Sequence, residues 1–270
     1  MDLGITGRQA VVCAASSGLG FACAAALVSE GVNVTINARQ SDRLNEAVHL
    51  LRTINSAVRI QGIAGDITCP EVQNAVLTAT PTVDILVTNA GGPPVGGSHD
   101  WPREIWLQAI ETNMLTPIAL IQAVLGEMRN RRFGRIVNIT SGSVKAPRGT
   151  LSLSNGSRGG LTTYIAGLAR SSELASQNVT INNLLPGAFS TPRLMQTLAT
   201  DAQRWGKSSE SMEIERKKLI PAGRFGIPDE FGACCAFLCS MNAGGNDSNL
   251  LIVFYVQIVP DDFVMQLHRF

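Results

Sequence analysis

Between residues 11 and 20 the chain reads Val11-Val-Cys-Ala-Ala-Ser-Ser-Gly-Leu-Gly20, where a short β-branched segment runs into a turn of small residues. An apolar helix-type segment follows at 21–30, so the turn joins a strand to a helix. The first N–H groups of such a helix lack intrahelical partners and together favour a phosphate. Gly18 and Gly20 let the backbone approach a pyrophosphate, while Ser16 and Ser17 add hydroxyl donors and N-cap chemistry. The same turn also occurs as a plain connection, so the rest of the chain has to separate the two interpretations.

Composition narrows the classes of protein that the chain can belong to. With 270 residues, 45% of them hydrophobic, it fits one globular α/β domain over residues 1–270. The 22 Lys and Arg residues balance 21 Asp and Glu residues, which gives no electrostatic support for nucleic acid or an acidic membrane surface as a partner. The six cysteines show no metal-ligand spacing. We therefore expect no metal site, buried free thiols and a cytoplasmic location.

Strand and helix patterns alternate along the whole chain. Strands are expected at 10–14, 32–37, 58–64, 84–88, 134–139, 179–185 and 250–256. Helices are expected at 19–30, 42–52, 71–79, 103–131, 154–176 and 229–240. Alternation of this kind predicts a Rossmann-like, doubly wound parallel sheet of about seven strands with helices on both faces. Its ligand crevice is expected at the carboxyl ends of the strands.

Polar residues follow three of the expected strands. Arg39 comes after the second strand, where an acidic residue would bind a free ribose 2′-hydroxyl and an arginine favours a 2′-phosphate. This favours NADP and leaves NAD possible, unless Arg39 is merely a solvated loop residue. Asp66 ends the third strand, and Asn89 follows the fourth with the small residues Ala90 and Gly91. This last segment either brings the backbone close to a cofactor or is only a turn.

The motifs together carry a resemblance to a known family. They are Ala14-Ala-Ser-Ser-Gly-Leu-Gly20, Gly65-Asp66, Thr88-Asn-Ala-Gly91, Asn113, Gly134-Arg-Ile-Val-Asn-Ile-Thr-Ser141, and Pro186-Gly187 with Thr191. From about residue 7 to about residue 249 the chain resembles the short-chain dehydrogenases/reductases, in the branch similar to 3-oxoacyl-[acyl-carrier-protein] reductases. The resemblance implies an NADP(H)-dependent oxidoreductase that interconverts a small-molecule carbonyl and a secondary alcohol. It also implies a homotetramer or homodimer.

Cofactor contacts are likewise implied by the resemblance. The implied positions are Ala14, Ser16, Ser17, Gly18, Leu19 and Gly20 at the pyrophosphate, Asp66 at the adenine, Asn89, Ala90 and Gly91 at the adenosine ribose, and Pro186, Gly187 and Thr191 at the nicotinamide. Ala14 departs from the family, which has a glycine there. We expect Ala14 to adopt ordinary strand dihedrals and to displace the loop slightly.

The catalytic positions depart further from the family pattern of serine, asparagine, tyrosine and lysine. Ser141 and Asn113 match their places, but Ser154 stands at the tyrosine position and Arg158 at the lysine position. A serine hydroxyl is too weak an acid to replace tyrosine. Arg158 keeps a positive charge and a planar fork that can grip ribose hydroxyls, but it does not release its proton.

Three functions stay open on this basis. The first is a slow or specialised reductase, in which the two serines polarise the carbonyl and water supplies the proton; Lys145 and His99 are alternative acids on neighbouring loops. The second is a cofactor-binding but catalytically silent homologue. The third is cofactor-independent chemistry similar to that of halohydrin dehalogenases, which carry the arginine but keep the tyrosine.

Two further segments shape these expectations. Residues 188–218 resemble the substrate lid of the family, with a solvated charged face at 210–218. The tail at 250–270 lacks the acidic residue and two glycines expected after the last strand. It is expected to alter subunit contacts or pocket closure, or to derive from a shifted reading frame.

Overall fold

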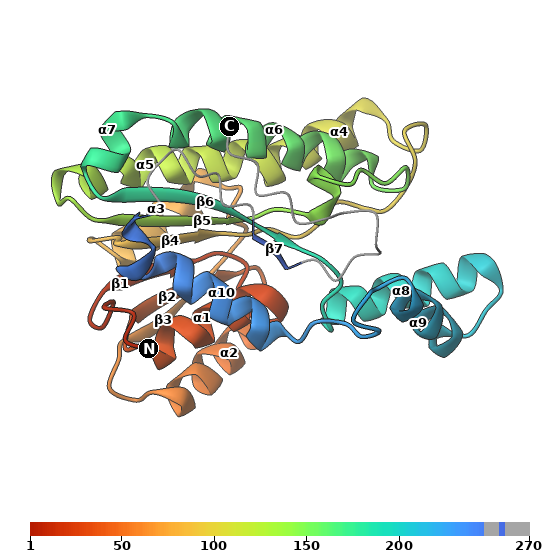
Figure 1. Cartoon of the computed structure of the whole chain (residues 1–270), viewed down its shortest axis with the longest axis horizontal. Helices are drawn as coiled ribbons and strands as arrows, with labels where there is room; N and C mark the ends of the chain where they lie inside the picture. Colours follow the sequence, from red (N-terminus) through yellow and green to blue (C-terminus); the bar gives the residue numbers. More distant parts are fainter. Residues whose placement is uncertain (246–253, 257–270) are drawn as a thin grey trace.

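The computed structural model describes residues 1–245 and 254–256. Its centre is a seven-stranded sheet in the order β3-β2-β1-β4-β5-β6-β7, with every neighbouring pair parallel. The strands are β1 (Gln9–Val12), β2 (Asn33–Ala38), β3 (Ile60–Ala64), β4 (Ile85–Thr88), β5 (Gly134–Ile139), β6 (Val179–Pro186) and β7 (Phe254–Val256). The predicted doubly wound parallel sheet is confirmed (Figure 1).

Helices cover both faces of this sheet (Figure 1). They are α1 (Gly18–Ser29), α2 (Ser41–Ile54), α3 (Pro70–Ala79), α4 (Arg103–Ile110), α5 (Thr116–Asn130), α6 (Ser152–Ala169), α7 (Ser172–Ser176), α8 (Pro192–Trp205), α9 (Ser209–Lys218) and α10 (Pro228–Cys239). Shorter turns are the π-helical η1 (Glu111–Leu115) and the 3₁₀ turns η2 (Gly142–Val144) and η3 (Asn242–Gly245). Helices α1, α2 and α10 pack on one face, and α3, α5 and α6 pack on the other.

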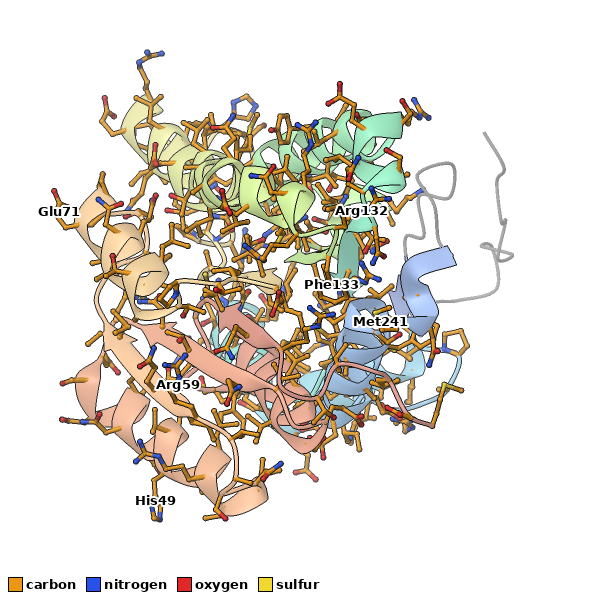
Figure 2. The ribbon with its side chains drawn as sticks, turned by 90° about the vertical axis from the view of Figure 1, so that its left-hand side faces the viewer. His49, Arg59, Glu71, Arg132, Phe133 and Met241 are labelled. Atoms are coloured by element: carbon orange, nitrogen blue, oxygen red, sulfur yellow. The ribbon has the colours of Figure 1, made fainter. Side chains whose placement is uncertain are left out.

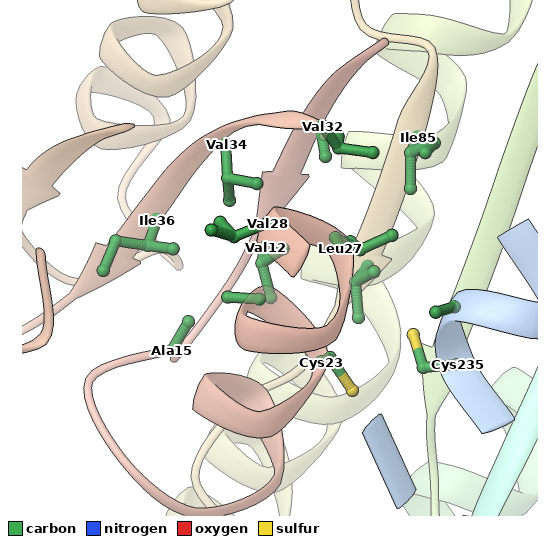
Figure 3. Packing of buried hydrophobic residues seen from close by; sticks show 14 of the residues in the cluster. Val12, Ala15, Cys23, Leu27, Val28, Val32, Val34, Ile36, Ile85 and Cys235 are labelled. Atoms are coloured by element: carbon green, nitrogen blue, oxygen red, sulfur yellow. The ribbon is translucent and has the colours of Figure 1, made fainter. Parts of the chain in front are cut away.

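The core follows from the alternation of side chains along buried strands. In β1, Ala10 and Val12 belong to the cluster under α1 and α10, whereas Val11 belongs to the cluster under α5 and α6. Figure 3 shows the first cluster, with Val12 near Leu27 of α1. Burial on both faces explains why apolar residues follow one another without alternation in β1 and β4.

The expectation of buried free thiols is confirmed for four of the six cysteines. Cys13, Cys23, Cys235 and Cys239 are free and buried, Cys234 is half-buried, and Cys69 is exposed. Figure 3 shows Cys23 and Cys235 between α1 and α10.

The helix predicted at 103–131 is confirmed as one helical run, Arg103–Asn130, which passes from α4 through the π-helical η1 into α5. Pro117 in the first turn of α5 explains the π-helical turn, because it has no N–H to donate to the carbonyl of residue 113. The whole stretch Arg103–Asn130 is long and apolar enough to cross a membrane, by length and composition only. Its residues Leu120 and Ile121 pack into the core beneath the sheet.

The helix predicted at 154–176 differs from the prediction. It begins at Ser152 and ends at Ala169, and α7 follows after Ser171, whose extended backbone interrupts the helix. The predicted strand at 250–256 is described over β7, and the remainder of the tail at 250–270 lies outside the described residues.

The predicted lid is the helical pair α8 and α9, which extends from one end of the sheet (Figure 1). A small cluster of Leu198, Ile220 and Phe225 holds the pair together. No residue of α9 is buried, as expected for its charged face. The lid therefore rests on few apolar contacts.

Two arginine side chains lie over the aromatic ring of Phe133, at the end of the sheet away from α8 and α9. The guanidinium carbons of Arg8 and Arg135 lie 3.7 Å and 4.6 Å from the centre of the Phe133 ring. Figure 2 shows Phe133 on the side of the molecule turned away from α8 and α9. Arg135 is fully buried and donates to Ser240 and Asn178, so this cluster fastens β5 to the C-terminal part of the core.

Candidate active site

The glycine turn between β1 and α1 is built around two glycines that no other residue replaces easily. Gly18 has φ +61°, in the left-handed region. At Gly20, a Cβ would lie 2.5 Å from the carbonyl oxygen of Ala14 and 2.9 Å from Nδ2 of Asn89. Asn89 Nδ2 also donates to this carbonyl oxygen at 3.3 Å. The end of β4 is therefore fastened to the turn, and α1 begins immediately beside both.

Two expectations for this turn are wrong. Ala14 does not have strand dihedrals: its φ is +49°, because the backbone must leave β1 in the left-handed conformation that a glycine adopts freely. Ser17 occupies the N-cap of α1, but its side chain makes no capping hydrogen bond. The Ser17 hydroxyl therefore makes no capping hydrogen bond to α1 and is available to a ligand.

A cleft of about 700 Å³ runs from this turn across the carboxyl ends of the strands. The predicted site residues that line it are Ala14, Ser16, Ser17, Arg39, Asp66, Ala90, Gly91 and Asn113. Asp66 lies at the end of β3, and its Oδ1 accepts hydrogen bonds from the N–H and the hydroxyl of Thr68. The volume is in the range typical of ligand pockets.

Two arginines line the cleft. Arg39 Nη2 lies 4.0 Å from the position that a Cβ on Gly91 would take, so its guanidinium reaches toward the loop after β4. Arg43, in the first turn of α2, lines the same cleft and was not predicted. Its signal in the sequence is its spacing of four residues from Arg39, across the start of a helix. Both side chains are exposed.

The other predicted residues lie beside the cleft and do not line it. They are Gly18, Leu19, Gly20, Asn89, Ser141, Ser154, Arg158, Pro186, Gly187 and Thr191. The start of the lid rests on the glycine turn, because the Thr191 side chain is 3.7 Å from the Cβ position of Gly18. Similarly, the Pro186 carbonyl oxygen lies 3.1 Å from the Cβ position of Gly142 in η2. The ends of β1, β5 and β6 are thus brought together.

Asn113 lies in the π-helical turn and is 3% exposed. Its Nδ2 donates to the carbonyl oxygen of Ala109 at 3.3 Å. Its Oδ1 is buried without a hydrogen-bond partner. A buried unpaired oxygen is costly, and one that borders a cleft is suited to a bound water or ligand.

Ser141 follows β5, and a second serine supports it. The two hydroxyl oxygens of Ser141 and Ser143 are 2.9 Å apart, and Ser141 Oγ accepts from the N–H of Ser143 at 3.1 Å. Ser143 was not predicted, although its spacing of two residues from Ser141 permits this contact. The pair fixes the Ser141 hydroxyl at the end of the strand.

Ser154 and Arg158 are both buried and share one face of α6, four residues apart. Arg158 Nη1 donates to the carbonyl oxygens of Ile139 and Thr140, at 2.8 Å and 3.0 Å. Burial, reinforced by the charge of Arg193, lowers the pKa of Arg158 to about 10. The end of β5 therefore occupies Nη1, and the predicted contact of Arg158 with ribose hydroxyls stays a prediction for Nη2 and Nε.

The alternative acids Lys145 and His99 are exposed. Lys145 directly follows η2, which brings it near Ser141, whereas His99 lies in the loop before α4. The structure records no hydrogen bond or ion pair of either side chain within the described residues.

Comparison with known proteins places this site in a family. The family model for short chain dehydrogenases matches residues 8–202. The chain belongs to this family. The match covers the glycine turn, the ends of the strands and the beginning of the lid.

Relatives within the family include reductases. A 3-oxoacyl-[acyl-carrier-protein] reductase from Vibrio cholerae is 33% identical, over 89% of this chain and 93% of the relative. A monensin polyketide synthase putative ketoacyl reductase from Streptomyces virginiae is 30% identical, over 92% and 96% of the two chains. The structure of L-sorbose reductase from Gluconobacter frateurii, complexed with NADPH and L-sorbose, is 29% identical with a TM-score of 0.84, over 92% and 95%.

Proposed function

We propose that the protein is an NADP(H)-dependent oxidoreductase that interconverts a carbonyl and a secondary alcohol. The observation that carries the proposal is the cleft, which is lined together by the glycine turn, two arginines and Asn113. The family supports the same general chemistry, since its relatives include ketoacyl reductases and an NADPH complex.

The residues of the cleft fit a phosphorylated dinucleotide. The space beside Gly20 leaves no room for a side chain, so the start of α1 presents bare backbone N–H groups to a pyrophosphate. Arg39 and Arg43 supply two cations for a ribose 2′-phosphate. Asp66 would lie by the adenine, and the orphaned Oδ1 of Asn113 is a further hydrogen-bond acceptor in the lining of the cleft.

A nicotinamide cofactor held in the cleft would supply or accept the hydride. Ser141, held by Ser143, and Ser154 donate hydrogen bonds to the carbonyl oxygen of the substrate, which polarises it. Arg158 contributes positive charge beneath them and holds the end of β5 in place. Because neither serine is acidic enough to replace the family's tyrosine, the proton comes from water. General acid catalysis contributes about 10²- to 10⁴-fold, so we expect turnover to be slower by that order.

A second candidate is a cofactor-binding homologue without turnover. It is favoured by the use of Arg158 Nη1 for backbone carbonyls, which leaves this side chain without a proton-relay role. The two candidates agree on cofactor binding and differ only in catalysis. Binding and turnover therefore have to be measured separately.

The test is a calorimetric titration with NADPH and, separately, with NADH. We expect NADPH to bind more tightly, and Arg39→Gln with Arg43→Gln to weaken NADPH binding by about tenfold or more while leaving NADH unchanged. The matched control is Arg170→Gln, an exposed arginine at the far end of α6. If neither cofactor binds, both candidates fail. If NADPH binds but a panel of ketones and aldehydes gives no turnover, the silent homologue stands.

A further inference from the structure

The start of the lid contacts two segments that line the cleft. Thr191, the N-cap of α8, packs on the glycine turn, with its side chain 3.7 Å from the Cβ position of Gly18. Arg193 follows two residues later, and its Nη2 donates to the carbonyl oxygen of Pro93 at 3.0 Å. Gly92 and Pro93 belong to the loop after β4 and line the cleft. The first turn of α8 therefore connects the glycine turn to this loop.

The loop after β4 also meets the arginine of the proposed phosphate site. Nη2 and Nε of Arg193 lie 3.8 Å and 4.0 Å from the position that a Cβ on Gly92 would take. Arg39 Nη2 lies 4.0 Å from the equivalent position at Gly91. Because neither glycine has a side chain, both guanidinium groups can come close to the loop. The loop is thus the segment through which the lid and the phosphate site are connected.

Other contacts of the lid hold its two helices to each other. The pair extends from one end of the sheet (Figure 1). Its small apolar cluster is formed by Leu198, Ile220 and Phe225. Lys207 Nζ at the end of α8 lies 2.8 Å from a carboxylate oxygen of Glu215 in α9. These contacts keep α8 and α9 together when the pair moves, whereas the hydrogen bond of Arg193 fastens the pair to the rim of the cleft.

The cleft does not include the proposed catalytic serines. Ser16, Ser17 and Asn113 line it, whereas Ser141 and Ser154 do not. A dinucleotide whose pyrophosphate lies at the glycine turn has to extend beyond the cleft before its nicotinamide meets these serines. The start of α8 lies against the same turn. The lid therefore lies beside the path that the nicotinamide half has to take.

We infer that the hydrogen bond from Arg193 to Pro93 holds the lid closed over this path, so that it breaks each time a dinucleotide cofactor enters or leaves. The inference rests on the proposed function and adds to it how exchange of the cofactor is controlled. Opening of a lid sets the turnover rate of many enzymes. One exposed hydrogen bond of this kind changes a rate constant by about three- to tenfold.

Stopped-flow fluorescence of NADPH measures both directions of exchange. Mixing NADPH with the protein gives the association rate constant, and displacement of bound NADPH by excess NADP⁺ gives the dissociation rate constant. Arg193→Gln is expected to raise both rate constants about three- to tenfold and to leave Kd unchanged, because opening precedes entry and release alike. Arg193→Lys keeps a cation that can donate to the carbonyl oxygen and is expected to restore slow exchange. The control is Arg204→Gln, an exposed arginine near the end of α8, which is expected to keep the original rates.

Hydrogen–deuterium exchange of the protein without cofactor tests the same contact independently of the proposed function. Arg193→Gln is expected to speed exchange in peptides covering residues 90–97 and 188–197, whereas Arg204→Gln is not. Faster exchange together with no NADPH binding to any form would reject the proposed function and keep the role of Arg193 in closing the lid.

Three results would overturn the inference. The first is NADPH binding with rate constants that are the same in Arg193→Gln and in the unsubstituted protein. The second is an increase in the dissociation rate constant alone, because Arg193 would then be a contact of the cofactor and would not hold the lid. The third is unchanged hydrogen–deuterium exchange in Arg193→Gln, because the hydrogen bond would then not hold the lid against the loop.

Discussion

Replacing Ala14 by glycine is expected to stabilise the protein. At φ +49° the Cβ of Ala14 crowds the backbone, which costs an L-residue about 1–2 kcal/mol. The glycine loses somewhat more backbone entropy on folding, about 0.5–1 kcal/mol. Little packing is lost, because Ala14 is only half-buried and faces the cleft. The net gain is therefore about 1 kcal/mol.

Differential scanning calorimetry measures this gain. Unfolding entropy near 60 °C is about 2.1 cal/mol/K per residue, so over 270 residues 1 kcal/mol raises Tm by about 2 °C. The matched control is Ala25→Gly within α1, where glycine lowers stability by about 1 kcal/mol. The two variants should shift Tm in opposite directions. If Ala14→Gly lowers Tm as Ala25→Gly does, the reasoning from backbone strain is refuted.

Three further results are expected. Gly20→Ala should lower the free energy of unfolding by about 1–3 kcal/mol in urea titrations, since its Cβ would lie 2.5 Å from a carbonyl oxygen of the same turn; an unchanged value would mean that the turn relaxes easily. The hydrogen bond from Arg224 lowers the pKa of Glu230 to about 2, so its contribution to stability is complete above its unfolded pKa near 4.5 and is lost as pH falls toward 2. Glu230→Gln should therefore make Tm depend less on pH between about 2 and 4.5. If Tm of the variant depends on pH as strongly as before, the pH dependence comes from other carboxylates. Finally, the double variant Ser154→Tyr, Arg158→Lys should raise ketone reduction by up to about 10²- to 10⁴-fold in a spectrophotometric NADPH assay, and an unchanged rate would count against a substrate pocket at this position.

Much of the fold was predictable because it follows from local patterns. Continuous apolar runs separated by amphipathic segments specify parallel strands and crossover helices, and the turn at Gly18 and Gly20 marks where the first crossover begins. The π-helical turn η1 inside the long helix was not predicted, although Pro117 indicates it, because the apolar periodicity alone continues through the turn. The polar residues at the strand ends were also recognised, because parallel strands bring their carboxyl ends to one edge.

The linear order of residues was sufficient for the doubly wound sheet and the place of the glycine turn. Only the tertiary structure decided how the polar and charged side chains at the strand ends are used. It determined that Ala14 lies in the left-handed region and that Arg158 binds the end of β5. It also determined that Arg193 of α8 donates to the carbonyl oxygen of Pro93 in the loop that lines the cleft. The reason is that backbone conformation at a turn, and the partners of a buried charge, depend on elements far apart in the chain that meet only after the sheet has formed.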